Sequence, residues 1–192
     1  MEILKYKIDS FYLIGDFEEH QYYKNTILQL ISTRPPSSFE SIDNYYGDRV
    51  YKLDWKDSYD HSRDWVEIIK PKLEIALTAM ARCAGYQKAI VNNIWFQQYV
   101  NGNTHGWHTH GNNFTGVYYL ELPLDAPKTQ LVNPFSQIDI LEPNIQEGQI
   151  IIFPSYTIHR APVITGQNLR KTIISFNLDF ENIDENTLKG IN

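Results

Sequence analysis

The chain has little cysteine, no excess of positive charge and no long apolar run. Its 192 residues include one cysteine, Cys83, which excludes an internal disulfide and a cysteine-based zinc site. We expect Cys83 to be a small buried apolar residue. The formal net charge of −6 argues against a nucleic-acid partner, because phosphate binding needs a basic surface. No stretch approaches the roughly 18 apolar residues of a membrane span, so no membrane partner is expected.

The N-terminal segment, Met-Glu-Ile-Leu-Lys-Tyr-Lys, also lacks an apolar signal region. We therefore expect a cytoplasmic protein. Apolar residues make up 42% and charged residues 21% of the chain, as in a globular protein. The length suits a single domain over residues 1–192. We expect residues 1–86 to form a supporting part and residues 87–180 to form the functional core.

Two helices are expected in the first 86 residues. The first covers about residues 18–32, with Asp16 as its N-cap. The second begins near Ser62 and ends at Gly85, which is a good C-terminal stop. Pro71 falls inside this second segment and predicts a kink or a fresh start there.

Beyond Gly85 the pattern changes to short apolar segments separated by Pro, Gly and Asn, without a helix between them. Aromatic residues make up 14% of the chain, a composition that favours strands. Helices followed by many short strands predict a mainly β fold, a double-stranded β-helix (jelly roll) with N-terminal supporting helices. The expected strands cover residues 2–14, 49–55, 89–100, 114–122, 130–133, 138–141, 149–153, 157–161 and 170–178.

Three of the six histidines fall within the segment Tyr99–His110. On a strand, residues i and i+2 point to the same side, so His108 and His110 would face one volume, about 7 Å apart at the backbone. His159 follows a later strand, and in a jelly roll a late strand can run beside an early one. His159 then becomes a third ligand. Three protein ligands leave positions free for substrate and oxygen, as a redox iron centre requires.

The other three histidines have simpler interpretations. His20 and His61 stand alone in the sequence, and a lone histidine is more often hydrogen-bonded than metal-bound. His105 lies in a turn rich in Gly and Asn. We expect it near the site without binding the metal.

Arg170 opens the last expected strand, on the same face as Thr172 and opposite Lys171. A guanidinium that reaches into the mouth of a barrel is a bidentate clamp for a carboxylate, and a hydroxyl two residues on adds a donor. The alternative is an arginine at a strand end, exposed to solvent.

With these residues in place, the chain resembles the iron(II)/2-oxoglutarate-dependent oxygenases, and among them the small prolyl-hydroxylase-like members, some found in bacteria and phages. The resemblance covers roughly residues 90–180. It rests on four segments in the same order: Tyr99–His110, Thr115–Leu120, Gly148–Ser155 with His159, and Arg170–Thr172.

The resemblance implies that His108 and His159 bind iron, and it places His110 where the family usually has Asp. Arg170 would pair with the distal carboxylate of 2-oxoglutarate. Tyr119 would hydrogen-bond that carboxylate, with Thr172 as a weaker candidate, and Tyr99 would lie near the co-substrate or the iron.

The implied activity is that of a dioxygenase and hydroxylase, of prolyl type by analogy, which uses Fe(2+), 2-oxoglutarate and O2, with ascorbate as a further candidate. Its substrate would be a small molecule or a peptide, in the cytoplasm of a bacterium or a phage-infected host cell. Exposed aromatic residues would permit a homodimer. Two alternatives stay open: a cupin-like metalloenzyme that does not use 2-oxoglutarate, in which Arg170 is incidental, and a non-catalytic jelly-roll binding module.

Overall fold

The computed structural model describes residues 10–34 and 48–183. In these residues, eight of the ten strands follow the two α-helices. In chain order the elements are β1 (Leu13–Asp16), α1 (His20–Ser32), β2 (Lys52–Leu53), the 3-10 helix η3 (Trp55–Asp57), α2 (Asp64–Cys83), β3 (Tyr86–Tyr99), β4 (His105–His108), β5 (Phe114–Glu121), β6 (Gln130–Val132), β7 (Ile140–Leu141), β8 (Gln149–Pro154), β9 (His159–Ala161) and β10 (Lys171–Ile183).

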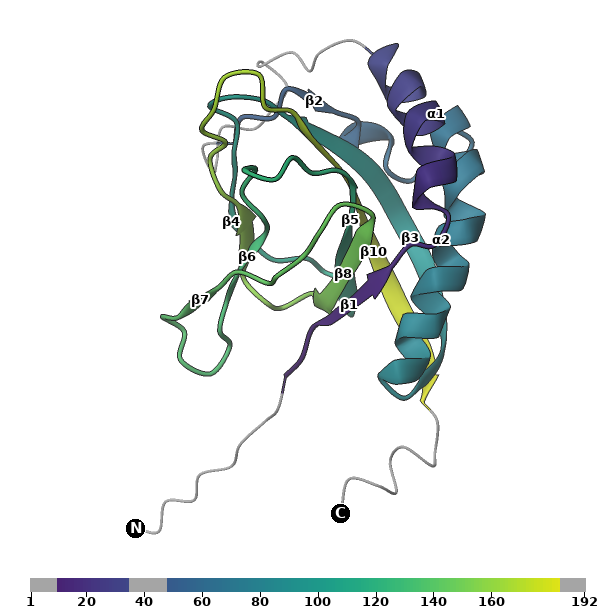
Figure 1. The fold of residues 1–192 in the computed structure, drawn as a ribbon. Helices are drawn as coiled ribbons and strands as arrows, with labels where there is room; N and C mark the ends of the chain where they lie inside the picture. Colours follow the sequence, from purple (N-terminus) through teal and green to yellow (C-terminus); the bar gives the residue numbers. More distant parts are fainter. Residues whose placement is uncertain (1–9, 35–47, 184–192) are drawn as a thin grey trace.

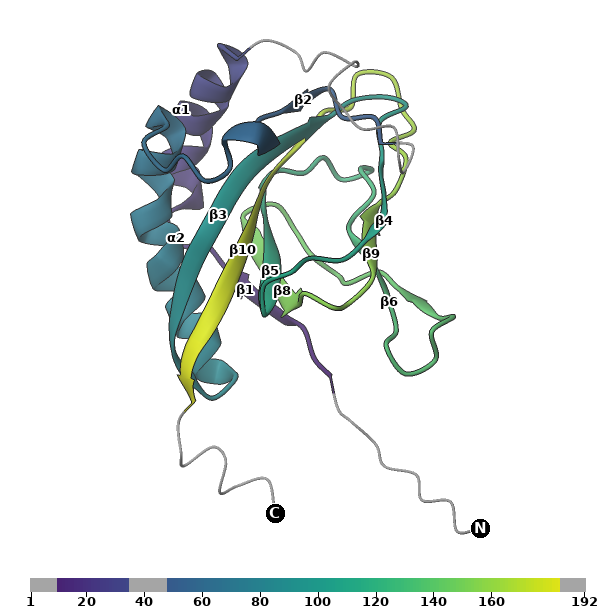
Figure 2. The same ribbon diagram turned by 180° about the vertical axis from the view of Figure 1, so that it is seen from behind.

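The strands form two antiparallel sheets that face each other. The larger sheet has the order β1-β8-β5-β10-β3-β2, and the smaller has the order β4-β9-β6-β7. Figures 1 and 2 show both α-helices on the outer face of the larger sheet and the smaller sheet across from its inner face. This arrangement confirms the predicted jelly roll with N-terminal supporting helices.

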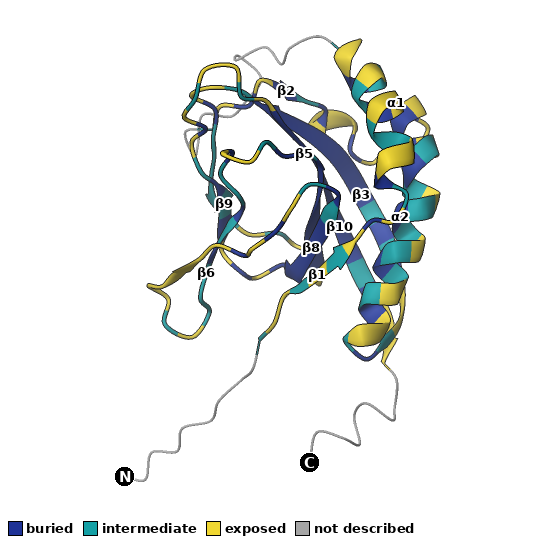
Figure 3. Cartoon of the chain, viewed as in Figure 1, coloured by how far each residue is buried: buried dark blue, intermediate teal, exposed yellow. Residues whose placement is uncertain are grey.

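The helices cover the larger sheet because α2 carries an apolar stripe at helical spacing. Trp65, Ile69, Leu73 and Leu77 are buried on this stripe, against the outward-facing apolar residues of the larger sheet. Figure 3 shows the buried stripe turned toward the sheet and the exposed side toward solvent. Pro71 lies inside α2, which continues through it, so a fresh start of the helix at Pro71 is wrong. We attribute the continuity to the buried residues on both sides of Pro71, since most helical stability comes from tertiary packing.

Alternation along the strands divides the larger sheet between two cores. On β3, Ile94 and Phe96 pack beneath the helices, whereas Tyr99 belongs to the core between the two sheets. The register pairs Tyr99 with Lys171 and Trp95 with Ser175 across β3 and β10. The inner face of these two strands therefore runs from Tyr99 and Lys171 at one end toward Trp95 and Ser175, and this face lines the site.

Three local predictions need correction. Strand β1 includes Asp16, which is therefore no helix cap; Glu19 precedes α1 and makes no side-chain cap hydrogen bond. Strand β4 is absent from the strands expected from apolar periodicity, because its segment is rich in Gly and Asn; strand geometry was expected there only for His108 and His110. Cys83 is exposed at the end of α2 instead of buried. The predicted stop at Gly85 is confirmed by its φ of 84°, which favours glycine.

Residues 2–9 of the first expected strand lie outside the described residues. Across residues 10–34 and 48–183, neither α-helix is long and apolar enough to span a membrane.

Candidate metal centre and co-substrate pocket

Neighbouring strands bring the three candidate histidine ligands together. Strands β4 and β9 are antiparallel partners, with His108 directly opposite His159. His110 lies two residues beyond β4, where its backbone N–H donates to the Ser155 carbonyl oxygen at 3.0 Å. One ring nitrogen from each of the three lies within 4.8 Å of the others. His110 therefore reaches the cluster from a loop, and not from the strand that the sequence predicted.

Two of these imidazoles are oriented by backbone carbonyls. His108 Nδ1 lies 2.7 Å from the Gly106 oxygen, and His159 Nδ1 lies 2.9 Å from the Thr157 oxygen. A carbonyl oxygen can only accept, so we assign the hydrogen of each neutral ring to Nδ1. This leaves Nε2 with a free lone pair on both rings. Metal-binding histidines have the same arrangement, in which the second nitrogen donates to an oxygen acceptor.

The free Nε2 of His159 faces the Nε2 of His110 across a short gap. His110 Nε2 and His159 Nε2 are 3.3 Å apart. Two nitrogens that bind one ion at right angles, each about 2.1 Å from it, are roughly 3 Å apart. The spacing and the all-imidazole donor set therefore fit a divalent transition metal such as iron.

Burial keeps these imidazoles neutral at physiological pH. It lowers the pKa of His110 to about 4, lowers the pKa of His159 well below its usual range, and lowers the pKa of His108 as well. Neighbouring histidines add to the shifts of His110 and His159 because a second positive charge nearby is unfavourable. Only neutral imidazole binds a metal, so the cluster is ready to ligate without first losing a proton.

The cluster opens onto a cavity between the two sheets, with about 370 Å³ of space that includes the part open to solvent. Its walls come from the inner face of β3, β5 and β10 on one side and from β4 and β9 on the other. Besides the histidines, they include Trp95, Gln97, Tyr99, Thr115, Thr129 and Ser175.

His105 lies beside the cluster without joining it. Its ring centre is 4.0 Å from that of His108, and its Nδ1 lies 3.1 Å from Gln97 Nε2. Gln97 Oε1 in turn accepts a hydrogen bond from Ser175 Oγ at 3.1 Å. Burial lowers the pKa of His105 to about 3. Sequence reasoning missed Gln97 and Ser175, since only the register of β3 and β10 shows that they face the cavity.

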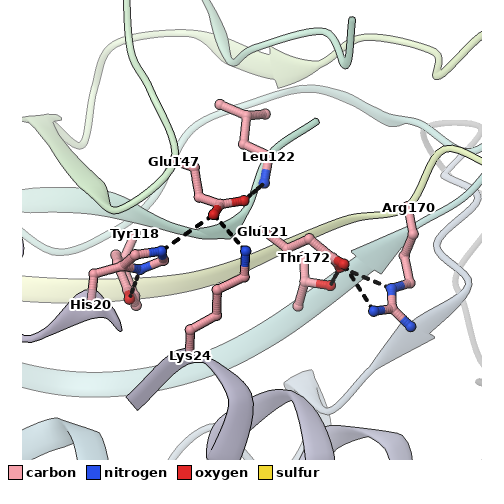
Figure 4. Close-up of polar contacts among 8 residues, drawn as sticks. All are labelled: His20, Lys24, Tyr118, Glu121, Leu122, Glu147, Arg170 and Thr172. Carbon is pink, nitrogen blue, oxygen red and sulfur yellow. Dashed lines mark hydrogen bonds and ion pairs between the residues drawn. The ribbon is translucent and has the colours of Figure 1, made fainter. Parts of the chain in front are cut away.

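His20 lies away from the cavity, between α1 and the outer face of the larger sheet. Its Nδ1 is 2.6 Å from the Tyr118 hydroxyl, and its Nε2 is 3.4 Å from Glu147, which also binds Lys24 (Figure 4). These contacts connect α1 to the larger sheet.

His61, like His20, is not among the residues that line the cavity.

The structure does not bring Arg170 to the histidines. The side chain of Arg170 is 48% exposed and makes two hydrogen bonds of 2.8 Å to Glu121 (Figure 4). Thr172 Oγ1 donates to the same carboxylate at 2.8 Å and accepts from Gln98 Nε2 at 3.0 Å. Arg170 and Thr172 thus belong to a polar cluster that does not line the cavity. In this cluster, the Arg170 guanidinium is already bonded to the Glu121 carboxylate.

Lys171, on the opposite side of the same strand, points inward. It is 1% exposed, its Nζ lies 5.0 Å from the centre of the Tyr99 ring, and it donates to the Pro127 carbonyl oxygen at 2.8 Å. The ion pairs found among the described residues do not include Lys171. Burial lowers the pKa of Lys171 to about 8. A buried ammonium group without a carboxylate has a strong reason to bind an anion.

Two tyrosines predicted at the co-substrate behave differently. Tyr99 lines the cavity, and its buried hydroxyl has no hydrogen-bond partner among the described residues. Tyr119 does not line the cavity; its hydroxyl donates to Thr129 Oγ1 at 2.7 Å and accepts from the Thr129 N–H at 3.0 Å. Tyr99 therefore has a free polar group to offer a ligand, whereas the Tyr119 hydroxyl is already bonded.

A family model described as "Putative 2OG-Fe(II) oxygenase" matches residues 93–177, which include the three clustered histidines, Tyr99 and Lys171. Residues 93–177 are therefore similar to the iron(II)/2-oxoglutarate-dependent oxygenases. No curated protein matches the chain.

Solved structures share the fold of this chain at low sequence identity. A prolyl-4-hydroxylase from Pseudomonas putida is 10% identical, with a TM-score of 0.61 over 88% of this chain and 92% of the other. The non-heme alpha-ketoglutarate-dependent epimerase SnoN from nogalamycin biosynthesis is 11% identical, with a TM-score of 0.64 over 88% and 77%. A prolyl hydroxylase from Trichoplax adhaerens, in complex with a hypoxia-inducible-factor peptide fragment, is 14% identical, with a TM-score of 0.58 over 94% and 87%.

Proposed function

We propose that this oxygenase holds iron(II) through His108, His110 and His159 and hydroxylates an organic substrate with 2-oxoglutarate and O2. The observation that carries the metal assignment is the pair of facing Nε2 atoms of His110 and His159, 3.3 Å apart. His108 and His159 are both fixed by carbonyl acceptors at Nδ1, so their Nε2 lone pairs are directed without reorganisation.

For the co-substrate we assign the carboxylate clamp to Lys171 in place of Arg170. Lys171 is a buried cation whose Nζ lies 5.0 Å from the ring centre of Tyr99, a residue that lines the cavity and whose hydroxyl has no partner among the described residues. A carboxylate between them would pair with the ammonium and accept from the hydroxyl, which satisfies both groups. Thr172 and Tyr119, which already have partners, would support the strands and not touch the co-substrate.

Iron(II) with bound keto acid and O2 supplies the oxidising chemistry in this superfamily. The chain itself has three tasks. Its neutral imidazoles hold the metal, Lys171 and Tyr99 orient the keto acid toward the metal, and the apolar core between the sheets excludes water from the deep end of the cavity.

We propose prolyl-type hydroxylation of a small molecule or a peptide, because structural neighbours include prolyl hydroxylases and one of them binds a peptide. SnoN has the same fold and is an epimerase, so the fold by itself does not fix the reaction.

The test is anaerobic titration of the chain with iron(II), followed by 2-oxoglutarate. We expect one iron per chain and a visible metal-to-keto-acid charge-transfer absorption. Single changes His108→Ala, His110→Ala and His159→Ala should each weaken iron binding, whereas His61→Ala, outside the cavity, should leave it unchanged. Iron binding without the absorption would favour the cupin-like alternative, and a folded chain that binds no iron would favour a binding module.

Substrate candidates can then be ranked by oxygen-dependent succinate formation from 2-oxoglutarate. Free proline, prolyl peptides and unrelated amino acids form a first panel, with ascorbate included as a reductant. A true substrate should raise the succinate yield and gain one oxygen atom, measured by mass spectrometry.

A further inference from the structure

Asp48 is a largely buried carboxylate next to the histidine cluster, outside the four segments that carry the family resemblance. Its side chain is 12% exposed. The backbone after it is held against the segment before β4, because Arg49 and Thr104 exchange two hydrogen bonds of 2.9 Å. Asp48 Oδ1 accepts a hydrogen bond from the Gly106 N–H at 2.7 Å. Its position beside β4 is therefore fixed by three hydrogen bonds.

Gly106 connects this carboxylate to a candidate metal ligand. Its N–H donates to Asp48, and its carbonyl oxygen accepts from His108 Nδ1 at 2.7 Å. A carboxylate that acts on a metal-bound histidine usually accepts directly from its ring. Here the glycine backbone stands between the two, so the carboxylate sets the position of the carbonyl that orients His108.

His105 gives Asp48 a second path to the cluster. Its Nδ1 faces the Gln97 amide, which donates because its oxygen already accepts from Ser175. We therefore assign the hydrogen of His105 to Nε2, which points toward Asp48 Oδ2 at 3.9 Å. The ring of His105 packs on that of His108, so its dipole lies between the carboxylate and the cluster.

The electrostatic effect of Asp48 reaches the cluster. Its negative charge raises the pKa of His108 against the larger effect of burial. For His110 and His159, burial is followed by repulsion from neighbouring histidines, and no carboxylate of the described residues contributes. Among residues 10–34 and 48–183, Asp48 is thus the carboxylate linked to the cluster, through the Gly106 backbone to His108 and at 3.9 Å from His105.

This charge matters because a common iron(II) oxygenase site has two histidines and one carboxylate, whereas three histidines converge here. Two histidines and a carboxylate give the metal one negative ligand, whereas three neutral imidazoles give it none. We propose that Asp48, through Gly106 and His105, supplies from outside the ligand set the negative charge that His110 does not provide. Asp48 would be a positioning and charge-compensating residue, and the proposal rests on the iron site proposed above.

The decisive variant is Asp48→Asn, because the asparagine oxygen can still accept from the Gly106 N–H while the charge is removed. We expect iron(II) affinity to fall about 10-fold, the lower end of the effect known for groups that support metal ligands. The charge-transfer absorption of the iron and 2-oxoglutarate complex should move to shorter wavelength, because iron(II) gives up an electron less readily without the nearby charge. The matched control is Asp125→Asn, an exposed carboxylate in a loop, which should change neither quantity.

A double-mutant cycle separates compensation from a merely structural role. In a His110→Asp background the ligand set again carries a carboxylate, so Asp48→Asn should cost much less affinity than it costs the wild type. If the two changes act independently, with the same loss in both backgrounds, Asp48 does not compensate for His110. Unfolding measurements on all four proteins show whether each is folded.

The outcomes also distinguish this inference from the proposed function. A wild-type chain that binds no iron(II), or shows no charge-transfer absorption, overturns the proposed function. A wild-type chain that does both, with an Asp48→Asn variant of unchanged affinity and unchanged absorption, overturns the inference about Asp48 alone.

Discussion

At the scale of single residues, the site depends on which of two neighbouring cations faces inward. Arg170 and Lys171 are adjacent, and successive residues of a strand point to opposite faces. Arg170 is bonded to Glu121 at the surface, whereas Lys171 is buried beside Tyr99 without a carboxylate. Co-substrate binding should therefore depend on Lys171.

The change Lys171→Met should weaken 2-oxoglutarate binding roughly 10- to 150-fold, the loss of a charged hydrogen bond of about 1.5–3 kcal/mol. Arg170→Gln should change the affinity by less than about twofold, because an exposed ion pair contributes little. Calorimetric titration of 2-oxoglutarate into manganese-loaded protein measures both. A large loss in Arg170→Gln together with little loss in Lys171→Met would return the clamp to Arg170.

The affinity for 2-oxoglutarate should also depend on pH. Burial lowers the pKa of Lys171 to about 8, so the ammonium is lost as pH rises through this value, while both carboxylates of the co-substrate stay ionised. The dissociation constant should be nearly flat below the pKa and rise by at most about tenfold per pH unit above it. Lys171→Arg keeps its charge in this range, and a pH dependence that persists in this variant would point to another group.

The sequence indicates the histidine cluster more clearly than the cation that would bind the co-substrate. His108, His110 and His159 stand out because histidine is rare and the three recur in a strand-rich region. The choice between Arg170 and Lys171 depends on which face of β10 points toward the cavity. Both faces of this strand are apolar, with Ile173 on one and Ile174 on the other. Nothing in such a strand shows which face meets the helices.

At the scale of elements, β5 and β10 approach closely at a glycine. Gly116 pairs with Phe176 across the two strands. A Cβ at Gly116 would lie 2.5 Å from the Phe176 ring and 2.8 Å from the Ile151 carbonyl oxygen. Both distances are too short, and the second involves backbone that cannot rotate away.

Gly116→Ala should therefore lower the free energy of unfolding by about 1–3 kcal/mol, as overpacking does in a close-packed core. The matched control is Gly111→Ala in the loop after His110, where a Cβ meets nothing within 4 Å. Its effect should stay within about 0.5 kcal/mol. Urea unfolding measures both, and a stable Gly116→Ala variant would mean that the two strands can separate without loss.

Element prediction succeeded where periodicity was long and failed where elements were short. The two helices and the long strands β3 and β10 follow from apolar spacing over many residues. Strand β4 has four residues and exists because β9 pairs with it. Tertiary pairing of this kind leaves no local signal in the sequence. The three histidines were therefore expected together, as the structure has them, but His110 was expected on a strand and lies beyond the end of β4.

At the scale of the whole molecule, one buried ion pair joins the N-terminal elements to the larger sheet. The carboxylate of Asp54, between β2 and η3, accepts from the Arg63 guanidinium, from Trp65 Nε1 at 3.0 Å and from the Phe96 N–H at 2.8 Å. Arg63 also donates to the Ile94 carbonyl oxygen. Burial raises the pKa of Asp54, and the partners oppose this shift.

Asp54→Ala should lower the free energy of unfolding by about 3–5 kcal/mol, because it leaves the Arg63 charge buried and unpaired. Asp57→Ala, an exposed carboxylate three residues on, should cost no more than about 0.5 kcal/mol. Denaturant unfolding with fluorescence of the tryptophans reports on both. A similar small effect of the two changes would show that Arg63 finds another partner.

The architecture as a whole follows from binary patterning, whereas the charge balance of the site does not. Helical spacing followed by short strands predicts supporting helices on a jelly roll, and the structure has this arrangement (Figures 1 and 2). Asp48 lies 60 residues before His108 in the sequence, and the pairing of Arg49 with Thr104 brings it beside β4.

The central claim is tested most directly by oxygen-dependent conversion of 2-oxoglutarate into succinate. The iron-loaded chain should form succinate in the presence of O2 and lose this activity when His159 is changed to Ala or iron is removed by a chelator. Arg170→Gln should retain it. A folded chain with one iron bound that forms no succinate with 2-oxoglutarate and O2 would contradict the account.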